Sequence, residues 1–362
     1  MRIVHLADLG APYPGSIVPM LRAVNDAAVK QGWSFEAVFT EVATGRPWYA
    51  DLKTDGIAVR IAPHTGRKTL AIWLDDLLAE RNVPTVLHTH FTTFDVPAVL
   101  AGRRRDDATI VWHVHSNLQS GLRAFLRNTA KFGLVGRRAD AILCVSSDLR
   151  DSVHRRLAPA RRLVAFPNAI DLERFDRATP EQRSRARAEL DVPEGRPLLV
   201  HFGWDWERKG GDLFLETVAT LDHEGVEVTA MCVGGGEPAH ATSERLGLGD
   251  RVLVTPPRDE VRTFHAAADV FVSSSRAEGM PSALLETLST GTPAVVSDIP
   301  SHIALAERVQ GCVVATRDPQ SFARAVRSVL STDCQVDVGE FADSIDLRAW
   351  AQRLLDLYAE VS

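Results

Sequence analysis

The chain has 362 residues, of which 45% are hydrophobic and 24% are charged. This length suits two domains rather than one small core, and the composition excludes wholesale disorder. No apolar run approaches the ~20 residues of a membrane-spanning helix, and His5 and Asp8 interrupt the region where a signal peptide must be apolar. The four cysteines lie far apart without a C-x-x-C pair, which argues against a disulfide framework. We therefore expect a cytoplasmic protein with reduced thiols.

The formal net charge of −6 conceals an asymmetry between the two halves of the chain. Residues 1–170 contain 22 Lys and Arg against 15 Asp and Glu, a net charge of +7, whereas the remainder contains 19 against 32, a net charge of −13. This split suggests that the two halves meet different partners. Nucleic acid is not expected as a partner, because the chain is acidic overall and no aromatic residues are interleaved with its basic clusters.

Short β-branched runs alternate with longer helical patterns along the first half of the chain. Such alternation is typical of βαβ units and of a parallel sheet with helices on both faces. The predicted strands are Ile3–Ala7, Phe35–Phe39, Ala58–Ile61, Thr85–His88, Thr109–Trp112, Ala141–Val145 and Leu163–Phe166. The predicted helices between them include Ile17–Lys30, Thr69–Arg81, Val96–Arg103 and Leu122–Val135.

The second half repeats this alternation after a connecting stretch, residues 167–197, that holds an Arg- and Glu-rich helix. Its predicted strands are Leu198–Phe202, Val226–Val233, Val252–Val254, Val270–Val272, Ala294–Val296 and Cys312–Val314. The pattern predicts an α/β fold with two doubly wound Rossmann-like domains, residues 1–171 and 172–346, and a final helix, Leu347–Ala359, with an apolar face. Ligands of open parallel sheets bind beyond the carboxyl ends of the strands, so we expect the site in a cleft between the domains.

The most informative segment is Asp269–Pro300. A buried strand, Val270–Val272, leads through a serine-rich loop to Glu278 and Gly279, and Pro281 then opens a helix. The dipole of this helix favours an anion such as a diphosphate at its N-terminus. Three free amides at the start of the helix are therefore predicted to face the cleft, those of Ser282, Ala283 and Leu284.

Two glutamates flank this helix start. Glu278 precedes the amide donors, so it can accept hydrogen bonds from sugar hydroxyls beside the phosphates. Glu286 lies about a turn and a half inside the helix, within reach of a ribose. For an isolated pair with this spacing, the simpler interpretation is that Glu278 caps the helix and Glu286 belongs to a solvated face.

The wider pattern favours the functional interpretation, because several motifs resemble the donor-site signature of retaining GT-B glycosyltransferases, specifically family 4. The signature consists of E-G-x-P from Glu278, a second glutamate eight residues later, and the run G-T-P-A-V-V-S-D that follows. The likeness covers roughly the whole chain and is most specific over residues 203–211 and 269–300. Further similar segments are Gly15-Ser16, His115 in IVWHVHS, PNAIDLERF from Pro167 to Phe175, Gly203 followed by Lys209-Gly210, and Gly234-Gly235-Gly236.

The resemblance implies a GT-B fold whose C-terminal helix, residues 347–362, packs back on the N-terminal domain. It implies a hexosyltransferase-type, retaining transfer from a nucleotide diphosphate sugar, UDP- or GDP-linked, to an acceptor on the N-terminal domain. The acceptor would attack on the face that the diphosphate leaves, while the protein stabilises the departing charge and orients the sugar. The implied catalytic residues are His115, Lys209 and Glu278. The implied donor-binding residues are Gly15, Ser16, Gly203, Arg208, Lys209, Gly235, Gly279, Met280, Pro281, Ser282, Ala283 and Glu286.

One position departs from the family pattern. Family members commonly place an arginine directly after the glycine that corresponds to Gly203, whereas this chain has Trp204. Lys209 remains as a compact charge suited to phosphate, and Arg208 is a candidate substitute whose direction the sequence leaves open. A strict D-x-D motif is absent, so neither a metal nor another cofactor is expected.

Further residues leave alternatives open. His88 and His90 end a predicted strand and could line the cleft, but no third metal ligand is apparent beside them. The arginines cluster in pairs and in Arg103-Arg104-Arg105, and the basic helix Leu122–Val135 fits either an anionic lipid surface at the inner membrane face or a solvated surface. The acceptor is accordingly a small molecule, a glycan or a lipid-linked compound, with an anionic one favoured by the basic half.

Two other functions stay open at the level of sequence. An epimerase or hydrolase that acts on nucleotide sugars could use the same fold and donor pocket without a sugar acceptor. A catalytically weakened partner subunit could bind the nucleotide sugar without turnover, and Trp204 is the one feature that favours this alternative.

Overall fold

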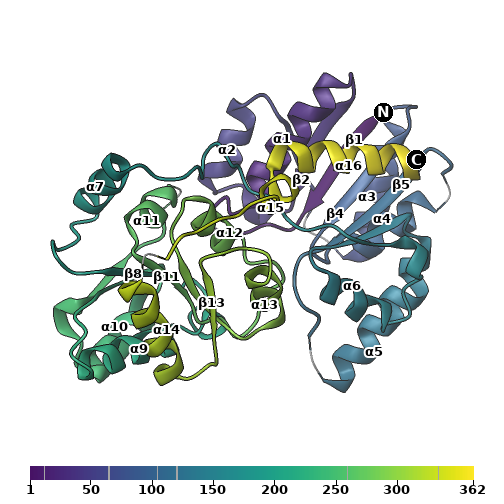
Figure 1. Ribbon diagram of the computed structural model, residues 1–362. Helices are drawn as coiled ribbons and strands as arrows, with labels where there is room; N and C mark the ends of the chain where they lie inside the picture. Colours follow the sequence, from purple (N-terminus) through teal and green to yellow (C-terminus); the bar gives the residue numbers. More distant parts are fainter. Residues whose placement is uncertain (12, 64–65, 104, 120, 259, 333) are drawn as a thin grey trace. The chain divides into compact units, whose positions relative to one another are not determined.

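The computed structural model describes residues 1–11, 13–63, 66–103, 105–119, 121–258, 260–332 and 334–362 (Figure 1). The chain divides into two compact units. Unit 1 comprises Met1–Ala169 and Ile345–Ser362, and unit 2 comprises Ile170–Ser344. Arg104 of the predicted basic clusters lies outside the described residues.

Unit 1 is built on seven parallel strands. They are β1 (Arg2–Ala7), β2 (Ser34–Phe39), β3 (Ala58–Ile61), β4 (Thr85–His90), β5 (Ala108–Val114), β6 (Ala141–Cys144) and β7 (Leu163–Ala165), in the spatial order β3-β2-β1-β4-β5-β6-β7. The helices are α1 (Ile17–Lys30), α2 (Pro47–Thr54), α3 (Arg67–Ala79), α4 (Asp95–Gly102), α5 (Leu122–Ala130), α6 (Ser147–His154) and α16 (Leu347–Val361). The strand order reverses between β1 and β4, which is where open α/β sheets leave room for a ligand.

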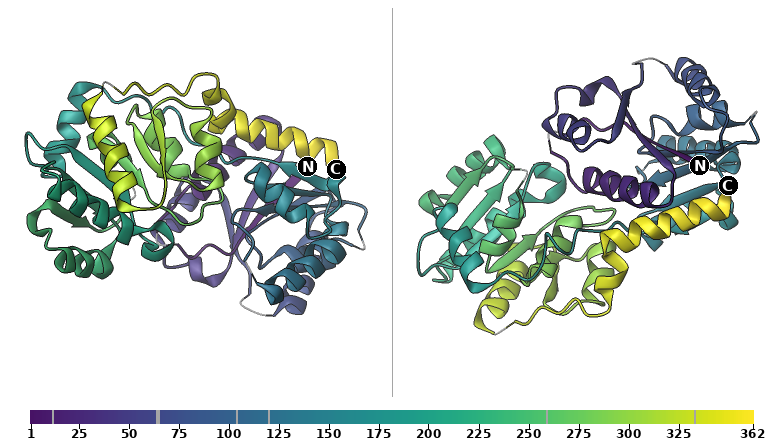
Figure 2. Two further views of the ribbon diagram at one scale, coloured as in Figure 1. Left: turned by 60° about the horizontal axis from the view of Figure 1, so that its bottom comes forward. Right: turned by 90° about the horizontal axis from the view of Figure 1, so that it is seen from above.

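The C-terminal helix α16 packs beside α1 on one face of this sheet (Figure 2). Trp350, Leu354 and Tyr358 recur at helical spacing on its buried side and share one core with residues of β1, β4 and β5. The indole N–H of Trp350 donates to the carbonyl oxygen of Pro167 over 2.8 Å. The C-terminal segment is therefore part of unit 1.

Unit 2 is built on six parallel strands. They are β8 (Leu198–Phe202), β9 (Thr229–Val233), β10 (Val252–Thr255), β11 (Val270–Ser273), β12 (Ala294–Ser297) and β13 (Cys312–Ala315), in the spatial order β10-β9-β8-β11-β12-β13. The helices are α7 (Pro180–Glu189), α8 (Trp206–Lys209), α9 (Gly211–His223), α10 (Gly236–Leu246), α11 (Arg262–Ala267), α12 (Ser282–Ser289), α13 (Pro300–Ala306), α14 (Pro319–Ser331) and α15 (Phe341–Ile345), which leads into α16. The strand order reverses between β8 and β11.

The predicted fold class is confirmed, since both units are doubly wound parallel sheets and each predicted strand has its counterpart. The second strand of the second half was expected from Val226 but begins at Thr229. The N–H of Val226 still bonds to the carbonyl oxygen of Leu221 over 2.9 Å, which closes the last turn of α9.

The basic helix predicted over Leu122–Val135 is also shorter than expected. Helix α5 ends at Ala130, and a π-helical turn over Lys131–Val135 follows it. In that turn the Lys131 ammonium lies 2.5 Å from the buried Asp95 carboxylate of α4. Within the part of the chain that the structure describes, no helix combines the length and the apolar character needed to cross a bilayer.

Candidate active site

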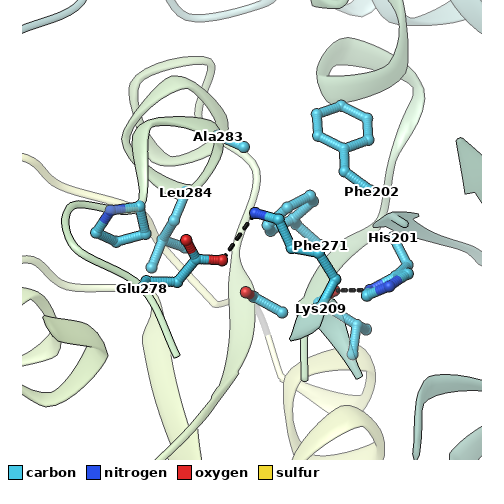
Figure 3. Close-up of a pocket in the computed structure, with 10 residues that line it drawn as sticks. His201, Phe202, Lys209, Phe271, Glu278, Ala283 and Leu284 are labelled. Carbon is cyan, nitrogen blue, oxygen red and sulfur yellow. Dashed lines mark hydrogen bonds and ion pairs between the residues drawn. The ribbon is translucent and has the colours of Figure 1, made fainter. Parts of the chain in front are cut away.

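A small pocket lies in unit 2 where the chain leaves the two central strands. Strand β8 continues into residues 203–210, and β11 continues into the serine-rich loop before α12. Figure 3 shows the Lys209 and Glu278 side chains pointing toward each other across this pocket. The lining residues are His201, Phe202, Lys209, Phe271, Val272, Ser273, Glu278, Pro281, Ala283 and Leu284.

The Glu278 carboxylate is held by three donors. Its Oε1 accepts hydrogen bonds from Lys209 Nζ (2.7 Å) and Ser275 Oγ (2.8 Å), and its Oε2 accepts one from Arg208 Nη1 (3.1 Å). The side chain is only 9% exposed. Burial by itself raises the pKa of Glu278, but the charge and hydrogen bond of Lys209, the charge of Arg208 and the Ser275 hydroxyl outweigh it, so the net pKa is lowered. A buried carboxylate thus stays ionised between two cations.

Arg208 points toward the same carboxylate as Lys209, a direction that the sequence left open. Both lie on the single turn α8, and Arg208 also bonds through Nε to Asp205 Oδ2 over 2.6 Å. Burial lowers the pKa of the Arg208 guanidinium, yet Glu278 and Asp205 raise it above its usual value. Arg208 thus places a second cation beside Lys209 on the Glu278 carboxylate.

Trp204 supports Lys209 by a different contact. The Lys209 ammonium lies 5.4 Å from the centre of the Trp204 ring, which is the geometry of a cation–π interaction. The Trp204 ring is stacked on Phe202 with their centres 5.2 Å apart. Trp204, which stands where family members commonly have an arginine, thus contributes to the placement of the Lys209 ammonium.

Glycines let the two loops approach closely. Gly210 has φ +70°, and a Cβ there would lie 2.1 Å from the backbone oxygen of Ser274, so only glycine fits between Lys209 and the loop after β11. Gly203 and Gly235, two of the residues expected to bind the donor, also leave space for the Trp206 indole. A Cβ would lie 3.1 Å from that ring at Gly203 and 2.9 Å at Gly235.

The start of α12 differs from the prediction. Pro281 precedes the helix, and two of the three amides expected to be free have local acceptors. The N–H of Ser282 bonds to Met280 O (3.0 Å) and the N–H of Leu284 bonds to Pro281 O (3.0 Å), because the first turn is tightened. Among the described residues, Ala283 N–H is the one of the three without an acceptor, and Ala283 lines the pocket. Gly279 lies in the half-buried turn just before Met280.

Glu286 is engaged with α11 rather than with the pocket lining. Its Oε2 lies 3.3 Å from His265 Nε2, and Nδ1 of the same imidazole lies 2.7 Å from Thr287 Oγ1. The Thr287 hydroxyl also bonds to the carbonyl oxygen of Ala283 over 2.7 Å. The structure thus ties Glu286 through Thr287 to the residue that carries the free amide, and it does not bring Glu286 against Glu278.

A neutral network behind Glu278 was not predicted. The Ser275 hydroxyl lies 3.4 Å from that of Ser273, which lies 3.3 Å from Nε2 of the buried His302. Burial lowers the pKa of His302 to about 4, so its imidazole is neutral at pH 7. The sequence signal for this network is the run of three serines that begins with the last residue of β11, Ser273. His201, at the end of β8, likewise has its pKa lowered by burial to about 4.

The predicted residues of unit 1 lie at two other loops. Gly15 has φ +52° and Ser16 precedes α1 without a side-chain capping bond. His115 follows β5, is half-buried, and has its Nε2 2.9 Å from Nδ1 of His90. Burial lowers the pKa of His115 to about 3, which keeps its imidazole neutral.

Histidines of adjacent strands gather beside His115. The expectation that His88 and His90 lack a third metal-ligand partner is wrong, because the parallel strands β1 and β5 supply His5, His113 and His115. Two sets of three have ligand atoms within 4.8 Å of one another, His5 with His88 and His90, and His90 with His113 and His115. In both sets, ring nitrogens already face each other at hydrogen-bond distance, 2.9 Å between His5 and His90 and 2.9 Å between His90 and His115.

Two protein-family models match this chain. The family model described as Glycosyltransferase Family 4 matches residues 33–174, and the model described as Glycosyl transferases group 1 matches residues 196–332. Together they match more than half of the chain. The chain belongs to the group 1, family 4 glycosyltransferases. The predicted family membership is therefore confirmed.

Curated relatives match this family member over part of their length. The D-inositol 3-phosphate glycosyltransferase of Geodermatophilus obscurus is 32% identical over 209 residues, which are 53% of this chain and 46% of the relative. The lipopolysaccharide core biosynthesis glycosyltransferase LpsE of Rhizobium meliloti is 34% identical over 150 residues, 40% of this chain and 43% of the relative. The chain thus spans about half the length of the curated relatives that it matches.

Solved structures share the whole fold. A glycosyltransferase from Rickettsia africae superposes with a TM-score of 0.84 at 14% identity, over 99% of this chain and 98% of that one. Anabaena HepE, solved in complex with UDP, superposes with a TM-score of 0.81 at 17% identity, over 99% of this chain and 100% of that one. At these identities the likeness establishes the GT-B fold.

Proposed function

We propose that this protein is a retaining, metal-independent glycosyltransferase that moves a sugar from a nucleoside diphosphate sugar, bound in unit 2, to an acceptor held by unit 1. The observation that carries the proposal is the buried Glu278 carboxylate between Lys209 and Arg208 at the carboxyl edge of the sheet. The names of similar proteins agree with it, since one relative is a UDP-Gal-dependent galactosyltransferase of Escherichia coli and HepE was also solved with UDP-glucose. A UDP- or GDP-linked donor is accordingly expected.

In the proposed complex, the donor diphosphate binds the two cations that are paired with Glu278. Lys209 is largely buried, Arg208 is 40% exposed, and both are held in place by Glu278, so a diphosphate can take over part of their interaction without a large rearrangement. The free Ala283 N–H adds one amide donor at the start of α12. Because Lys209 and Arg208 then interact partly with the diphosphate, Glu278 can accept hydrogen bonds from hydroxyls of the sugar.

The environment of Glu278 favours same-face transfer over a covalent intermediate. Three donors already engage its two oxygens, which leaves a poor nucleophile. In the proposed step the anomeric carbon forms a bond to the acceptor oxygen as its bond to the phosphate oxygen breaks. The acceptor proton passes to the departing diphosphate, whose charge Lys209 and Arg208 stabilise. No redox partner or metal ion is needed for this balance.

A binding and turnover panel tests the proposal. A nucleoside diphosphate at a hundred times its dissociation constant should stabilise the protein by about 2.7 kcal/mol in a thermal-shift assay against UDP, GDP, ADP and dTDP. Proton NMR of the product should then show the anomeric configuration of the donor. Inversion would overturn the retaining mechanism. Donor consumption that saturates without any acceptor would replace the proposal with a hydrolase or epimerase, and binding without turnover would replace it with a partner subunit.

We also propose that the acceptor side meets an anionic lipid surface, through α5 and the turn that follows it. Large apolar side chains are exposed there, with Leu122 74% and Leu134 70% exposed. Phe125 carries the Arg156 guanidinium 4.1 Å above its ring. Arginines therefore flank an apolar surface, the combination that binds anionic bilayers at their interface. The other large exposed residues of this surface are Leu126 and Leu157.

Vesicle sedimentation tests this surface. The protein should bind phosphatidylcholine vesicles that contain phosphatidylglycerol, bind pure phosphatidylcholine less, and dissociate as salt rises. The double substitution Leu122→Ser with Leu126→Ser should abolish binding, whereas Ile72→Ser, an exposed residue of α3, should not. Equal binding by both variants would show that the arginine-rich face is an ordinary solvated surface.

A further inference from the structure

A chain of hydrogen bonds runs through unit 1 from the C-terminal helix to His115. Tyr358 of α16 is fully buried, and its hydroxyl contacts Nε2 of His5 over 2.8 Å and Nδ1 of His88. Nδ1 of His5 lies 2.9 Å from Nε2 of His90. Nδ1 of His90 in turn lies 2.9 Å from Nε2 of His115. These five side chains come from β1, β4, the end of β5 and α16.

Strand register explains why the rings meet. His5 of β1 is paired with His88 of β4, and His90 of β4 is paired with His113 of β5. Side chains two apart on a strand share a face, so both histidines of the H-x-H on β4 lie on the side where Tyr358 packs. His113 stacks on His115 with ring centres 4.1 Å apart and takes no part in the chain of hydrogen bonds.

All members of this chain are neutral at pH 7. Burial, followed by the neighbouring histidines, lowers the pKa of His88 and His90 well below its usual value. Burial and the neighbouring His115 lower the pKa of His5 to about 3, and burial raises the pKa of the Tyr358 hydroxyl. Each side chain then carries one exchangeable proton. The four hydrogen bonds use four of these five protons. The fifth proton lies at one end of the hydrogen-bonded series, on either His88 or His115.

The two ends differ in what surrounds them. At one end, Nε2 of His88 is buried and has no hydrogen-bond partner among the described residues. An orphaned buried N–H is rarer in proteins than an acceptor with an unfilled lone pair. At the other end, His115 is half-buried, and its Nδ1 can donate to water or to a ligand. The remaining proton therefore belongs on His115 Nδ1.

We propose that Tyr358 is a positioning residue that fixes His115 as a neutral Nδ1–H donor. The hydroxyl accepts a hydrogen bond from His88 and donates one to His5, and every later bond then donates toward His115. His115 can accordingly donate to a sugar or acceptor oxygen and cannot act as a general base. The use of this donor in catalysis rests on the proposed function, whereas the direction of the hydrogen bonds does not.

Histidine tautomers measured by long-range ¹H–¹⁵N NMR test the direction without any substrate. In the full-length protein at pH 7, His5, His88, His90 and His115 should all carry their proton on Nδ1, the form that free histidine disfavours. Tyr358→Phe removes the donor to His5, so a substantial fraction of His115 should shift to the Nε2–H form. Tyr49→Phe, a buried tyrosine of α2 in the same core whose ring neighbours are Phe39 and Trp48, should leave the tautomers unchanged.

Three results would overturn the inference. They are an Nε2–H tautomer of His115 in the native protein, unchanged tautomers in Tyr358→Phe with its fold intact by circular dichroism, and one tightly retained Zn²⁺ per chain that is lost in His113→Ala. Activity is a separate readout, for which Tyr358→Phe should lower kcat by up to about tenfold, the value of one hydrogen bond, with little change in donor KM. If the tautomers shift as expected in a protein that transfers no sugar, the inference stands and the proposed function fails.

Discussion

Both sheets carry a buried polar cluster at the two strands between which the strand order reverses. The cluster lies mainly on the strands themselves in unit 1 and in the segments that follow the strands in unit 2. In unit 1 these strands are β1 and β4, and the cluster consists of imidazoles and one phenol. In unit 2 they are β8 and β11, and the cluster is the carboxylate of Glu278 with the cations of Lys209 and Arg208. One fold thus holds a neutral cluster in one unit and a fully ionised cluster in the other.

The difference follows from the intrinsic pKa of the groups. An imidazole titrates close to neutral pH, so burial is enough to remove its charge at small cost. Carboxylates, lysines and arginines have ordinary pKa values far from pH 7. In unit 2, pairing within 2.7 Å and 3.1 Å therefore compensates the burial of the Glu278 charge instead. The neutral cluster is suited to orienting hydroxyl groups. The ionised cluster is suited to binding a diphosphate, because its cations can shift part of their interaction from Glu278 to the phosphates.

Loss of Lys209 should have the largest effect. Lys209→Met removes the cation that lies closest to Glu278 and that we place on the leaving diphosphate, so kcat/KM should fall by about 100- to 1,000-fold. Binding of the bare nucleoside diphosphate, measured by calorimetry, should weaken as well. Arg245→Met, an exposed cation of α10, is the matched control and should change neither. Unchanged nucleotide affinity in Lys209→Met would show that the diphosphate lies elsewhere.

Neutralising Glu278 should separate binding from turnover. Glu278→Gln keeps the shape of the side chain and removes the negative charge that competes with a diphosphate for Lys209 and Arg208. The affinity for the bare nucleoside diphosphate should therefore rise, while kcat falls by about 100-fold because the sugar is no longer oriented. Calorimetry and initial rates give the two values. Weaker nucleotide binding in Glu278→Gln would mean that the carboxylate itself holds the donor nucleotide.

The sequence located most of the ionised cluster and little of the neutral one. Glu278 and Lys209 are named by their motifs, but the ion pair between them joins residues far apart in the chain, and it depends on the close approach that Gly210 allows. His88 and His115 are visible as single candidates. Their connection through Tyr358 could not be predicted, because it requires the strand register and the docking of α16.

Other parts of the sequence pattern have structural roles that the pattern did not indicate. The rule that the first amides of a helix are free fails for Ser282 and Leu284, since the first turn of α12 tightens around Pro281. Gly203 and Gly235 match a phosphate-loop pattern, yet their missing side chains also make space for Trp206. A glycine motif indicates that another group packs closely against the backbone, but it does not show whether that group is a ligand or a side chain of the protein.

Acid should weaken unit 1 before unit 2. A buried histidine whose folded pKa is lowered stabilises the fold fully above the unfolded value of 6.5, and that stability is lost as the pH falls toward the folded value. For His5 and His115, with pKa values of about 3, the loss at pH 5 is about 2 kcal/mol each. In unit 2, His201 and His302, with pKa values of about 4, lose about 2 kcal/mol each at pH 5 as well. Unit 1 loses more in total because burial also lowers the pKa of His88, His90 and His113 well below its usual value, whereas Glu278 of unit 2 loses its contribution only below about pH 4.5.

Hydrogen exchange at pH 7 and pH 5, corrected for the intrinsic rate, resolves the two units. Protection of β1, β4 and β5 should fall more than protection of β8 and β11. Replacing His88 with glutamine, which cannot be protonated in this range, should reduce the difference between the two pH values in unit 1 alone. Equal loss of protection in both units would contradict the distinction between a neutral and an ionised cluster.

Trp204 gives the smallest expected effect and the finest test of the ionised cluster. A cation–π contact at a partly exposed ring contributes about 0.5–1 kcal/mol, and Trp204 is 43% exposed. Trp204→Leu, which keeps an apolar side chain against Phe202, should therefore weaken nucleoside diphosphate binding by about two- to fivefold, because Lys209 loses the ring that steadies it. Trp204→Phe retains an aromatic face and should restore most of the affinity. If both variants bind as tightly as the native protein, then Glu278 alone positions Lys209, and the tryptophan at this position only fills the space beside Gly234.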